Sequence, residues 1–396
     1  MGTAGASEKV NTHHEPLISY LFSSFLRLGL TAFGGPAMVV YIKEMAVNRR
    51  RWLDEQTFKE GVVLCQSIPG ATAMQMAAYV GLRSKGIPGA FSSFIGFGLP
   101  AFVLMLVLSS LYATYHDLPR IISLFKGLQI VVVAIVANAT YSFGKGTFKN
   151  YKGIILAVAA TLLLWVRASP FIVIMGAAFT GIIFLGNDDC IPLSTANRIT
   201  NRYSVKHLFI LLLALLSMLF SFYLIDKRLF DLAVLMMRID LFAFGGGFAS
   251  VPLMLHEVVV VRGWIDSKTF MDGMALGQVT PGPIVITSTF VGYLTQGIVG
   301  AAAATIAIFT PSFLMVVAFT PLMDRLKTSV YFLRATKGIL ASFVGLLFFV
   351  TVKFALAVQW DVVKTLMGCA AVTALVKKID IIYVVLIATA ISVIIF

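Results

Sequence analysis

Long apolar runs separated by short polar stretches follow one another along almost the whole chain. An α-helix rises about 1.5 Å per residue, so about 20 apolar residues are needed to cross about 30 Å of hydrocarbon. Runs that approach or exceed this length predict membrane-spanning helices at residues 87–113, 121–143, 153–168, 170–186, 207–225, 298–320, 332–352, 355–376 and 380–396. The pattern therefore predicts an all-α polytopic membrane protein.

Longer apolar segments at 17–47, 54–86, 229–261 and 266–296 are each interrupted near their middle by glycine and proline. The interruptions are Gly34-Gly35-Pro36, Pro69-Gly70, Gly245-Gly246-Gly247 and Pro281-Gly282-Pro283. Proline and glycine break helices, so each segment is expected to form two half-helices. Re-entrant hairpins are favoured over full crossings, because full crossings would place the Arg49–Arg51 loop on the outside.

The interruptions recur because the sequence repeats. Ala32–Gly35 returns as Ala243–Gly246 at an offset of 211, and Trp52–Gly70 matches Trp264–Gly282 at nine of 19 positions. The predicted organisation is a polar tail (1–16), a first repeat (17–186), a polar linker with a connecting transmembrane helix (187–228) and a second repeat (229–396).

The charges of the loops predict that the two repeats have inverted topology. Arg49–Arg51 in the first copy correspond to Arg262 alone in the second, whereas Arg120 alone corresponds to a loop with Arg325, Lys327 and Arg334. Cytoplasmic loops are the ones enriched in lysine and arginine, so the opposite bias requires opposite orientations. The protein is expected to lie in the cell membrane with its N-terminus in the cytoplasm.

Composition supports this interpretation and excludes others. The chain is 59% hydrophobic and 12% charged, with a mean hydropathy of +0.93. These values exclude a soluble enzyme and a nucleic-acid binder. The net charge of +13 lies mainly in short loops, where it orients the protein. Cys65, Cys190 and Cys369 are too far apart to predict a disulfide framework or a metal cluster, and the polar first residues predict no cleavable signal peptide.

The broken segments contain nearly all the polar groups that have no evident place in lipid. Half-helices that begin at mid-membrane expose unpaired N–H groups and the positive end of the helix dipole, and two inverted copies would direct them at one site. Such a site suits an anion and needs no cofactor or metal. Its candidate residues are Arg27, Gly34, Gly35, Gln66, Pro69 and Gly70 in the first copy, and Arg238, Gly245, Gly246, Gln278, Thr280, Pro281 and Gly282 in the second.

Several other residues have both a functional and a plainer interpretation. Candidates for charge balance or coupling are Lys126, Lys337, Glu44, Glu257 and Asp240; most carboxylates of this kind are solvated at helix ends, and both lysines can extend to the interface. Asp240 could also pair with Arg238. Trp52 and Trp264 are expected to be interfacial anchors, and the glycine blocks could be packing faces.

The paired Phe-Gly-Gly blocks, the W-[LI]-D…L-x-Q-x-x-P-G blocks and the Thr-Pro-Gly-Pro of the second copy resemble the chromate transporter family. The resemblance covers almost the whole chain. It implies a carrier that moves chromate, commonly as efflux conferring resistance, with sulfate as isosteric competitor. The matching motif positions are Phe33–Pro36, Trp52, Gln66, Pro69, Gly70, Phe244–Gly247, Trp264, Gln278 and Pro281–Pro283. Ala71-Thr72 stands where the family usually has proline and asparagine.

The leading hypothesis is a secondary transporter of tetrahedral oxyanions, chromate or sulfate, embedded in the lipid bilayer. The chain has no GxxxxGK[ST] motif, so ATP coupling within it is not expected. The alternatives are a passive anion channel and a sulfate carrier for which chromate is incidental. A membrane-embedded enzyme would need a convergent His, Cys or carboxylate cluster, which the apolar segments lack. The coupling ion and a homodimeric assembly are left open.

Overall fold

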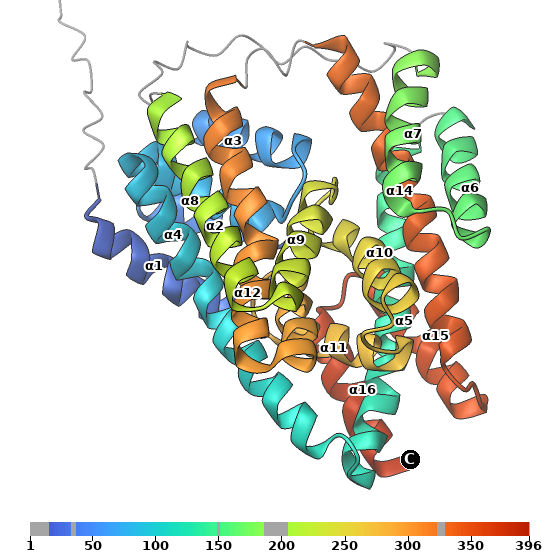
Figure 1. The fold of residues 1–396 in the computed structure, drawn as a ribbon. Helices are drawn as coiled ribbons and strands as arrows, with labels where there is room; N and C mark the ends of the chain where they lie inside the picture. The colour runs from blue at the N-terminus through green and yellow to red at the C-terminus, as the bar shows by residue number, and fades with distance from the viewer. Residues whose placement is uncertain (1–15, 33–36, 149–150, 186–204, 323–328, 396) are drawn as a thin grey trace, which may run out of the picture.

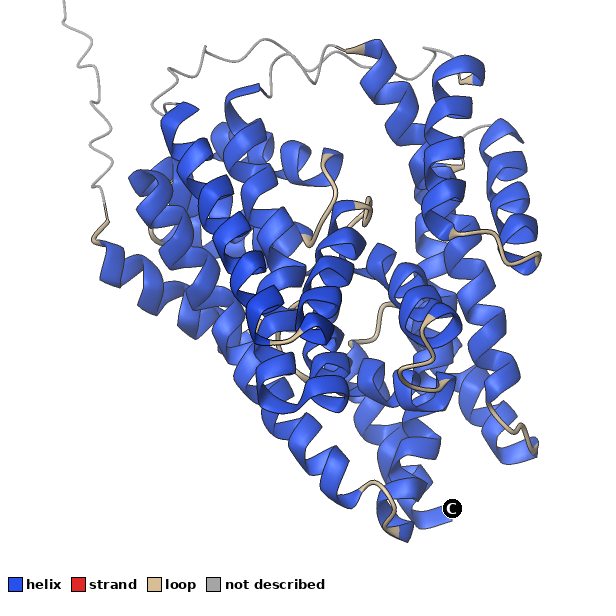
Figure 2. Ribbon diagram, viewed as in Figure 1, coloured by secondary structure: helices blue, strands red, loops and turns tan. Residues whose placement is uncertain are grey.

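The computed structural model describes residues 16–32, 37–148, 151–185, 205–322 and 329–395. Within these ranges every regular element is a helix, and no strand is present (Figure 2). The prediction of an all-α protein is thus confirmed for the part of the chain that the structure describes.

The helices follow the predicted repeat. The first repeat contains α1 (Ile18–Thr31), α2 (Ala37–Lys43), η1 (Glu44–Arg49), α3 (Glu55–Ser67), α4 (Thr72–Tyr115), α5 (Pro119–Thr147), α6 (Tyr151–Trp165) and α7 (Pro170–Phe184). A connecting helix, α8 (Val205–Ile225), precedes the second repeat. That repeat contains α9 (Lys227–Leu241), η2 (Gly247–Ala249), α10 (Ser250–Leu255), η3 (His256–Val261), α11 (Ser267–Val279), η4 (Ile284–Ile286), α12 (Thr287–Phe319), η5 (Thr320–Leu322), α14 (Val330–Ala357), α15 (Val362–Val376) and α16 (Ile381–Ile395).

The segment predicted at 54–86 folds back on itself as a helical hairpin. The Tyr79 ring packs on Gly61, and the Tyr79 hydroxyl donates a hydrogen bond to the Thr57 carbonyl at 3.2 Å. These contacts place the first part of α4 antiparallel to α3, with the turn at Pro69-Gly70. The hairpin is the form that the sequence favoured over a full crossing.

The corresponding segment of the second repeat has the same form. The Phe290 ring packs on Gly273, and a Cβ on Gly277 would lie 2.9 Å from the Thr287 Oγ1. The start of α12 therefore runs antiparallel to α11, and Pro281–Pro283 form the tip of this hairpin.

Each long helix after a hairpin contains a second reversal. Lys85 and Gly86 leave the helical conformation within α4, and Gly86 has φ +71°. The Ser93 hydroxyl donates to the Ala77 carbonyl at 2.7 Å, so the two parts of α4 lie side by side. The same break occurs in α12 at Gln296–Gly297. Only the second part of each helix corresponds to a predicted crossing.

The two repeats run in opposite directions. α4 ends and α5 begins at the bottom of Figure 1, whereas α12 ends and α14 begins at the top. α5 and α14 are antiparallel neighbours, because Thr140 and Thr351 share a hydrogen bond at 3.2 Å while Gly144 packs near Val344. The arrangement is that of inverted repeats.

Four of the predicted crossings are shorter than expected. α6, α7, α15 and α16 contain 15 residues each, which corresponds to about 22 Å and is less than the hydrocarbon thickness. They pack as an outer layer on the longer helices: α6 and α7 contact α14, while α15 and α16 contact α5.

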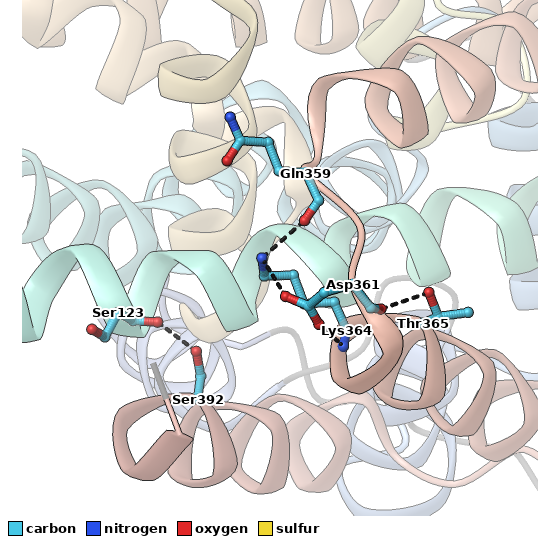
Figure 3. A network of polar contacts seen from close by, with 6 residues as sticks. All are labelled: Ser123, Gln359, Asp361, Lys364, Thr365 and Ser392. Carbon is cyan, nitrogen blue, oxygen red and sulfur yellow. Dashed lines mark hydrogen bonds and ion pairs between the residues drawn. The ribbon is translucent and has the colours of Figure 1, made fainter.

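Polar contacts fix the ends of this outer layer (Figure 3). The Ser392 hydroxyl of α16 donates to the Ser123 carbonyl of α5 at 2.5 Å. Asp361 caps α15 by accepting from the Lys364 N–H at 2.8 Å. The Lys364 ammonium also binds the Asp361 carboxylate, and these hydrogen bonds hold the pKa of that carboxyl below its usual range.

The inverted arrangement gives a topology prediction. Because α5 and α14 are antiparallel, the end of α5 and the start of α14 lie on the same side, and the loop charges predict that this side is cytoplasmic. In a variant without native cysteines, single cysteines placed at 145–152 and at 324–327 should both resist an impermeant thiol reagent added from outside. Labelling of either loop from outside would contradict the inverted topology.

Candidate functional site

Equivalent residues start and stop the hairpin helices. Asp54 and Asp266 are the N-caps of α3 and α11, and each accepts a hydrogen bond at 2.8 Å from a backbone N–H of the first turn. Both helices end just before a Pro-Gly pair, because proline cannot continue a helix. The local sequence thus determines where each hairpin turns.

The tips of the hairpins are held together by a crossed pair of backbone hydrogen bonds. The Gly70 N–H of the first repeat donates to the Ala243 carbonyl of the second at 3.0 Å, and the Gly282 N–H of the second donates to the Ala32 carbonyl of the first at 3.1 Å. Gly70 and Gly282 have φ +118° and +122°, values that side-chain-bearing residues rarely adopt. The two turns therefore join the repeats at their common centre.

A cavity of about 560 Å³ lies against these tips. The beginnings of four helical segments line it: α2 at Met38 and Val39, α4 at Ala71–Ala73, η2–α10 at Gly247 and Phe248, and η4–α12 at Pro283 and Ile284. Helix N-termini present unpaired N–H groups and a positive dipole end. Four helix ends that favour negative charge therefore line the cavity, while the last turns of α3, at Gln66, and of α5, at Ser142–Thr147, form another part of its wall.

The side chains around the cavity are uncharged, and most of them are apolar. Gln66 of α3 is exposed to it, and Thr72, Ser142 and Thr147 add hydroxyl groups. The backbone of Gly245–Gly247 forms another part of the wall. No lysine, arginine, aspartate or glutamate is among the described residues that line it.

The other predicted binding residues do not all line this cavity. Gln278 does not line the cavity, and its Nε2 is buried without a hydrogen-bond partner in the described structure. The Thr280 hydroxyl donates within its own turn, to the Gly277 carbonyl at 3.1 Å. Pro69 and Pro281 stand at the tips beside Gly70 and Gly282. Gly34 and Gly35 lie outside the described residues.

The two intramembrane arginines lie apart from the central cavity. Arg27 lines a separate cavity of about 350 Å³ together with Arg49, Arg50 and Glu44. The Arg238 guanidinium lies over the Phe171 ring, 3.8 Å from its centre.

The expected pairing of Arg238 with Asp240 is wrong, because Asp240 faces another part of the structure. Its Oδ2 accepts a hydrogen bond from the Ser312 hydroxyl at 2.7 Å, and the Ser312 Oγ accepts from the Ala71 N–H at 2.9 Å. Asp240, Ser312 and Gln75 are fully buried, and the Gln75 Nε2 donates to the Pro69 carbonyl at 2.5 Å. These three side chains form a polar cluster behind the Pro69-Gly70 tip.

A second buried carboxylate, Asp272, is fully engaged. It accepts from the Tyr112 hydroxyl at 2.9 Å and from the Gln129 Nε2 at 2.8 Å. These bonds connect α11 of the second repeat with α4 and α5 of the first, so the contact secures the interface between the repeats.

The remaining candidates for coupling lie away from the cavity. Glu44 pairs with Arg49 at 3.1 Å, and Glu257 pairs with Arg262. Lys126 is exposed on α5, and Lys337 is half-buried on α14. Within the described ranges, no group of three or more His, Cys, Asp or Glu residues is placed to hold a metal ion.

Some residues of the site were missed by sequence reasoning. Ser142 and Thr147 resemble ordinary polar residues of a helix. Ser312 could have been found by comparing the copies, because Pro311-Ser312 corresponds to Pro100-Ala101. Asp240 differs in the same way from its counterpart, Gly29.

The fold and site define a multi-pass membrane protein of the transporter class, built from two inverted repeats. The model of the family described as "Chromate transporter" matches residues 19–182 and again residues 230–393. The chain therefore belongs to the chromate transporter family, as the sequence motifs indicated.

Individual relatives agree with this assignment. An uncharacterised transporter of Methanocaldococcus jannaschii is 43% identical over 98% of this chain and 96% of its own length. The "Chromate transport protein" of Cupriavidus metallidurans is 30% identical over 94% and 91% of the two chains. An uncharacterised transporter of Bacillus subtilis is 27% identical over 46% of this chain and 91% of its own. No solved structure matches.

Proposed function

We propose that this protein is a secondary transporter of the cell membrane that moves tetrahedral oxyanions, with chromate as substrate in efflux and sulfate as its analogue. The name of the Cupriavidus metallidurans relative supports the choice of substrate. The N-terminus faces the cytoplasm, as the loop charges favour.

The convergence of helix N-termini on one uncharged cavity is the observation that carries the proposal. An ion that leaves water must exchange its hydration shell for fixed donors, because an isolated charge in an apolar site is very costly. Backbone N–H groups at helix starts supply such donors without a counter-charge. The amide of Gln66 and the hydroxyl of Thr72 add hydrogen bonds that a tetrahedral oxyanion can accept.

The composition of the cavity walls also supports access of the anion from either side of the membrane. The walls come from both repeats, since Thr72 belongs to the first and Gly246 to the second, and a Cβ on Gly246 would lie 3.1 Å from the Thr72 Oγ1. Movement of one repeat against the other would open the cavity to alternate sides, which is the mode expected of inverted repeats. Arg27, Arg49 and Arg50 around the separate cavity provide positive charge that attracts the anion on its way in.

Flux into liposomes that contain the purified protein tests the proposal. We expect saturable chromate uptake that sulfate and molybdate inhibit. Phosphate is tested as a further competitor, and uptake is measured with and without an imposed proton gradient. Liposomes preloaded with sulfate should accumulate external chromate transiently above equilibrium, which requires exchange. Flux that only follows the electrochemical gradient, without such counterflow, would identify a passive anion channel. A much lower KM for sulfate than for chromate would identify a sulfate carrier for which chromate is incidental.

Gln66→Ala should weaken substrate binding without abolishing transport. Loss of one hydrogen-bond donor to a charged ligand costs about 1–3 kcal/mol, so the KM of counterflow should rise roughly tenfold. Gln359→Ala is the matched control, because Gln359 is an exposed residue of the α14–α15 loop. An unchanged KM in Gln66→Ala would place the anion elsewhere.

A further inference from the structure

The Pro-Gly tips of the two repeats have equivalent backbones and different surroundings. Behind Gly70 stand Ser312, Gln75 and Asp240, whose nearest atoms would contact a Cβ at that position. Behind Gly282 stands the methyl group of Ala101, which would lie 2.6 Å from such a Cβ. One tip is therefore backed by a carboxyl group and the other by the methyl group of Ala101.

Position by position, the second tip lacks the carboxyl group and the hydroxyl group of the cluster. Gly29 replaces Asp240 and Ala101 replaces Ser312, while Pro283 replaces Ala71 and so has no N–H. Repeats that have the same backbone hydrogen bonds at both tips thus differ in one connected set of polar groups. Packing alone does not require this difference, since the second tip is built without it.

The cluster contains two acceptor atoms without a donor. The Oδ1 of Asp240 and the Oε1 of Gln75 are buried and have no hydrogen-bond partner among the described residues. A buried ionised carboxylate without a cation is costly, and a proton on Oδ1 removes that cost. A proton there also supplies a donor in a region that otherwise contains unpaired acceptors.

No charged side chain of the described structure forms an ion pair with Asp240. Of the elements packed against α9, namely α8, α10 and α12, α10 and α12 contain no charged residue. Among the side chains that the structure describes, the titratable and charged ones on these elements, on α9 and on the adjoining part of α4 are Tyr223, Tyr293, Lys227, Arg228, Asp231, Arg238, Tyr79, Arg83 and Lys85. Tyr293 is separated from Ser312 by the break at Gln296–Gly297, and Arg238 lies over Phe171.

A short chain of hydrogen bonds links Asp240 to the cavity. The Ala71 N–H donates to the Ser312 Oγ, and the Ser312 hydroxyl donates to Asp240. Ala71 lines the cavity at the start of α4. Negative charge on Asp240 therefore lies just behind a wall of the proposed anion site, and its neutralisation reduces repulsion of a bound dianion.

We propose that Asp240, with Ser312 and Gln75, is the proton-binding site that couples oxyanion transport to the proton gradient, and that proton and anion are carried together. This inference rests on the proposed transport function. One proton binds the Asp240 carboxylate with each dianion and leaves on the other side, so each cycle moves one net negative charge. An inside-negative membrane potential drives that charge outward, in the direction of the proposed efflux. By reciprocity, the anion binds more tightly to the protonated protein.

Asp240→Asn tests this site because it resembles the protonated carboxyl. In the wild type, a proton gradient directed into the liposome should drive sulfate accumulation, and the KM of sulfate counterflow should rise with pH. In Asp240→Asn, counterflow at equal pH should continue, its KM should no longer depend on pH, and gradient-driven accumulation should be lost. Asp231→Asn, an exposed carboxylate on the same helix, should behave like the wild type.

Ser312→Ala provides a second variant that keeps the carboxyl group. The ionised carboxylate loses its donor, so the KM should begin to rise at a higher pH than in the wild type, with coupling preserved.

Gradient-driven accumulation in folded Asp240→Asn with an unchanged pH dependence would overturn the proposal, as would accumulation driven by sodium instead of protons. If Asp240→Asn does not fold, an unshifted pH dependence in Ser312→Ala would overturn it. Absence of counterflow in the wild type would instead refute the transport function itself.

Discussion

Replacing Gly282 by leucine is expected to abolish chromate uptake in liposomes while the protein still folds. Gly282 has φ +122°, and its N–H holds the Ala32 carbonyl of the other repeat. A side chain at this position is strained in that conformation and collides with Ala101, so the tip must move. The displaced tip would carry the adjoining start of η4–α12 away from the cavity.

The control for this variant is Gly263→Leu. Gly263 also has a positive φ, of +58°, but a Cβ there meets nothing within 4 Å. Its substitution imposes backbone strain without disturbing the tips, and uptake should remain close to that of the wild type. Uptake at the wild-type rate by Gly282→Leu would show that this tip takes no part in transport.

Asp272→Ala is expected to cause a large loss of stability. The change leaves the Tyr112 hydroxyl and the Gln129 amide without their acceptor at the interface between the repeats. Each unsatisfied buried group costs about 1–3 kcal/mol, so the free energy of unfolding should fall by roughly 2–6 kcal/mol. The midpoint of thermal unfolding of the purified protein in detergent measures this effect.

Asp272→Asn should be less harmful, because its remaining oxygen still accepts one of the two hydrogen bonds. Asp231→Ala removes an exposed carboxylate and should leave the unfolding midpoint unchanged. A midpoint equal to that of the wild type in Asp272→Ala would mean that this contact does not stabilise the interface.

The positions of the helix breaks were predictable because glycine and proline act locally. Proline removes an N–H and glycine permits positive φ, so Pro69-Gly70 and Pro281–Pro283 had to interrupt helices wherever they were placed. Their recurrence at a fixed offset also identified the repeats. The meeting of the tips followed from the inversion of one repeat against the other.

The orientation of individual side chains was harder to predict. Arg238 and Asp240 are two residues apart, and such residues point to nearly opposite faces of a helix, which is why they do not pair. Trp52, expected as an interfacial anchor, is buried beside Phe25 because α1 folds over it, with the two ring centres 6.3 Å apart. The separation of Arg27 from Gln66 likewise depends on how the hairpins pack.

The crossed hydrogen bonds impose an order on biogenesis. The ribosome completes Gly70 long before it reaches Ala243, and the Ala71 N–H must wait for a hydroxyl 241 residues later in the chain. Until then the first repeat has polar tip groups with no partner from the second repeat, in a solvent that cannot satisfy them. The contacts at the centre of the molecule are thus the last to form. Until the second repeat is synthesised, the polar tip groups of the first repeat must be hydrated or covered by the insertion machinery.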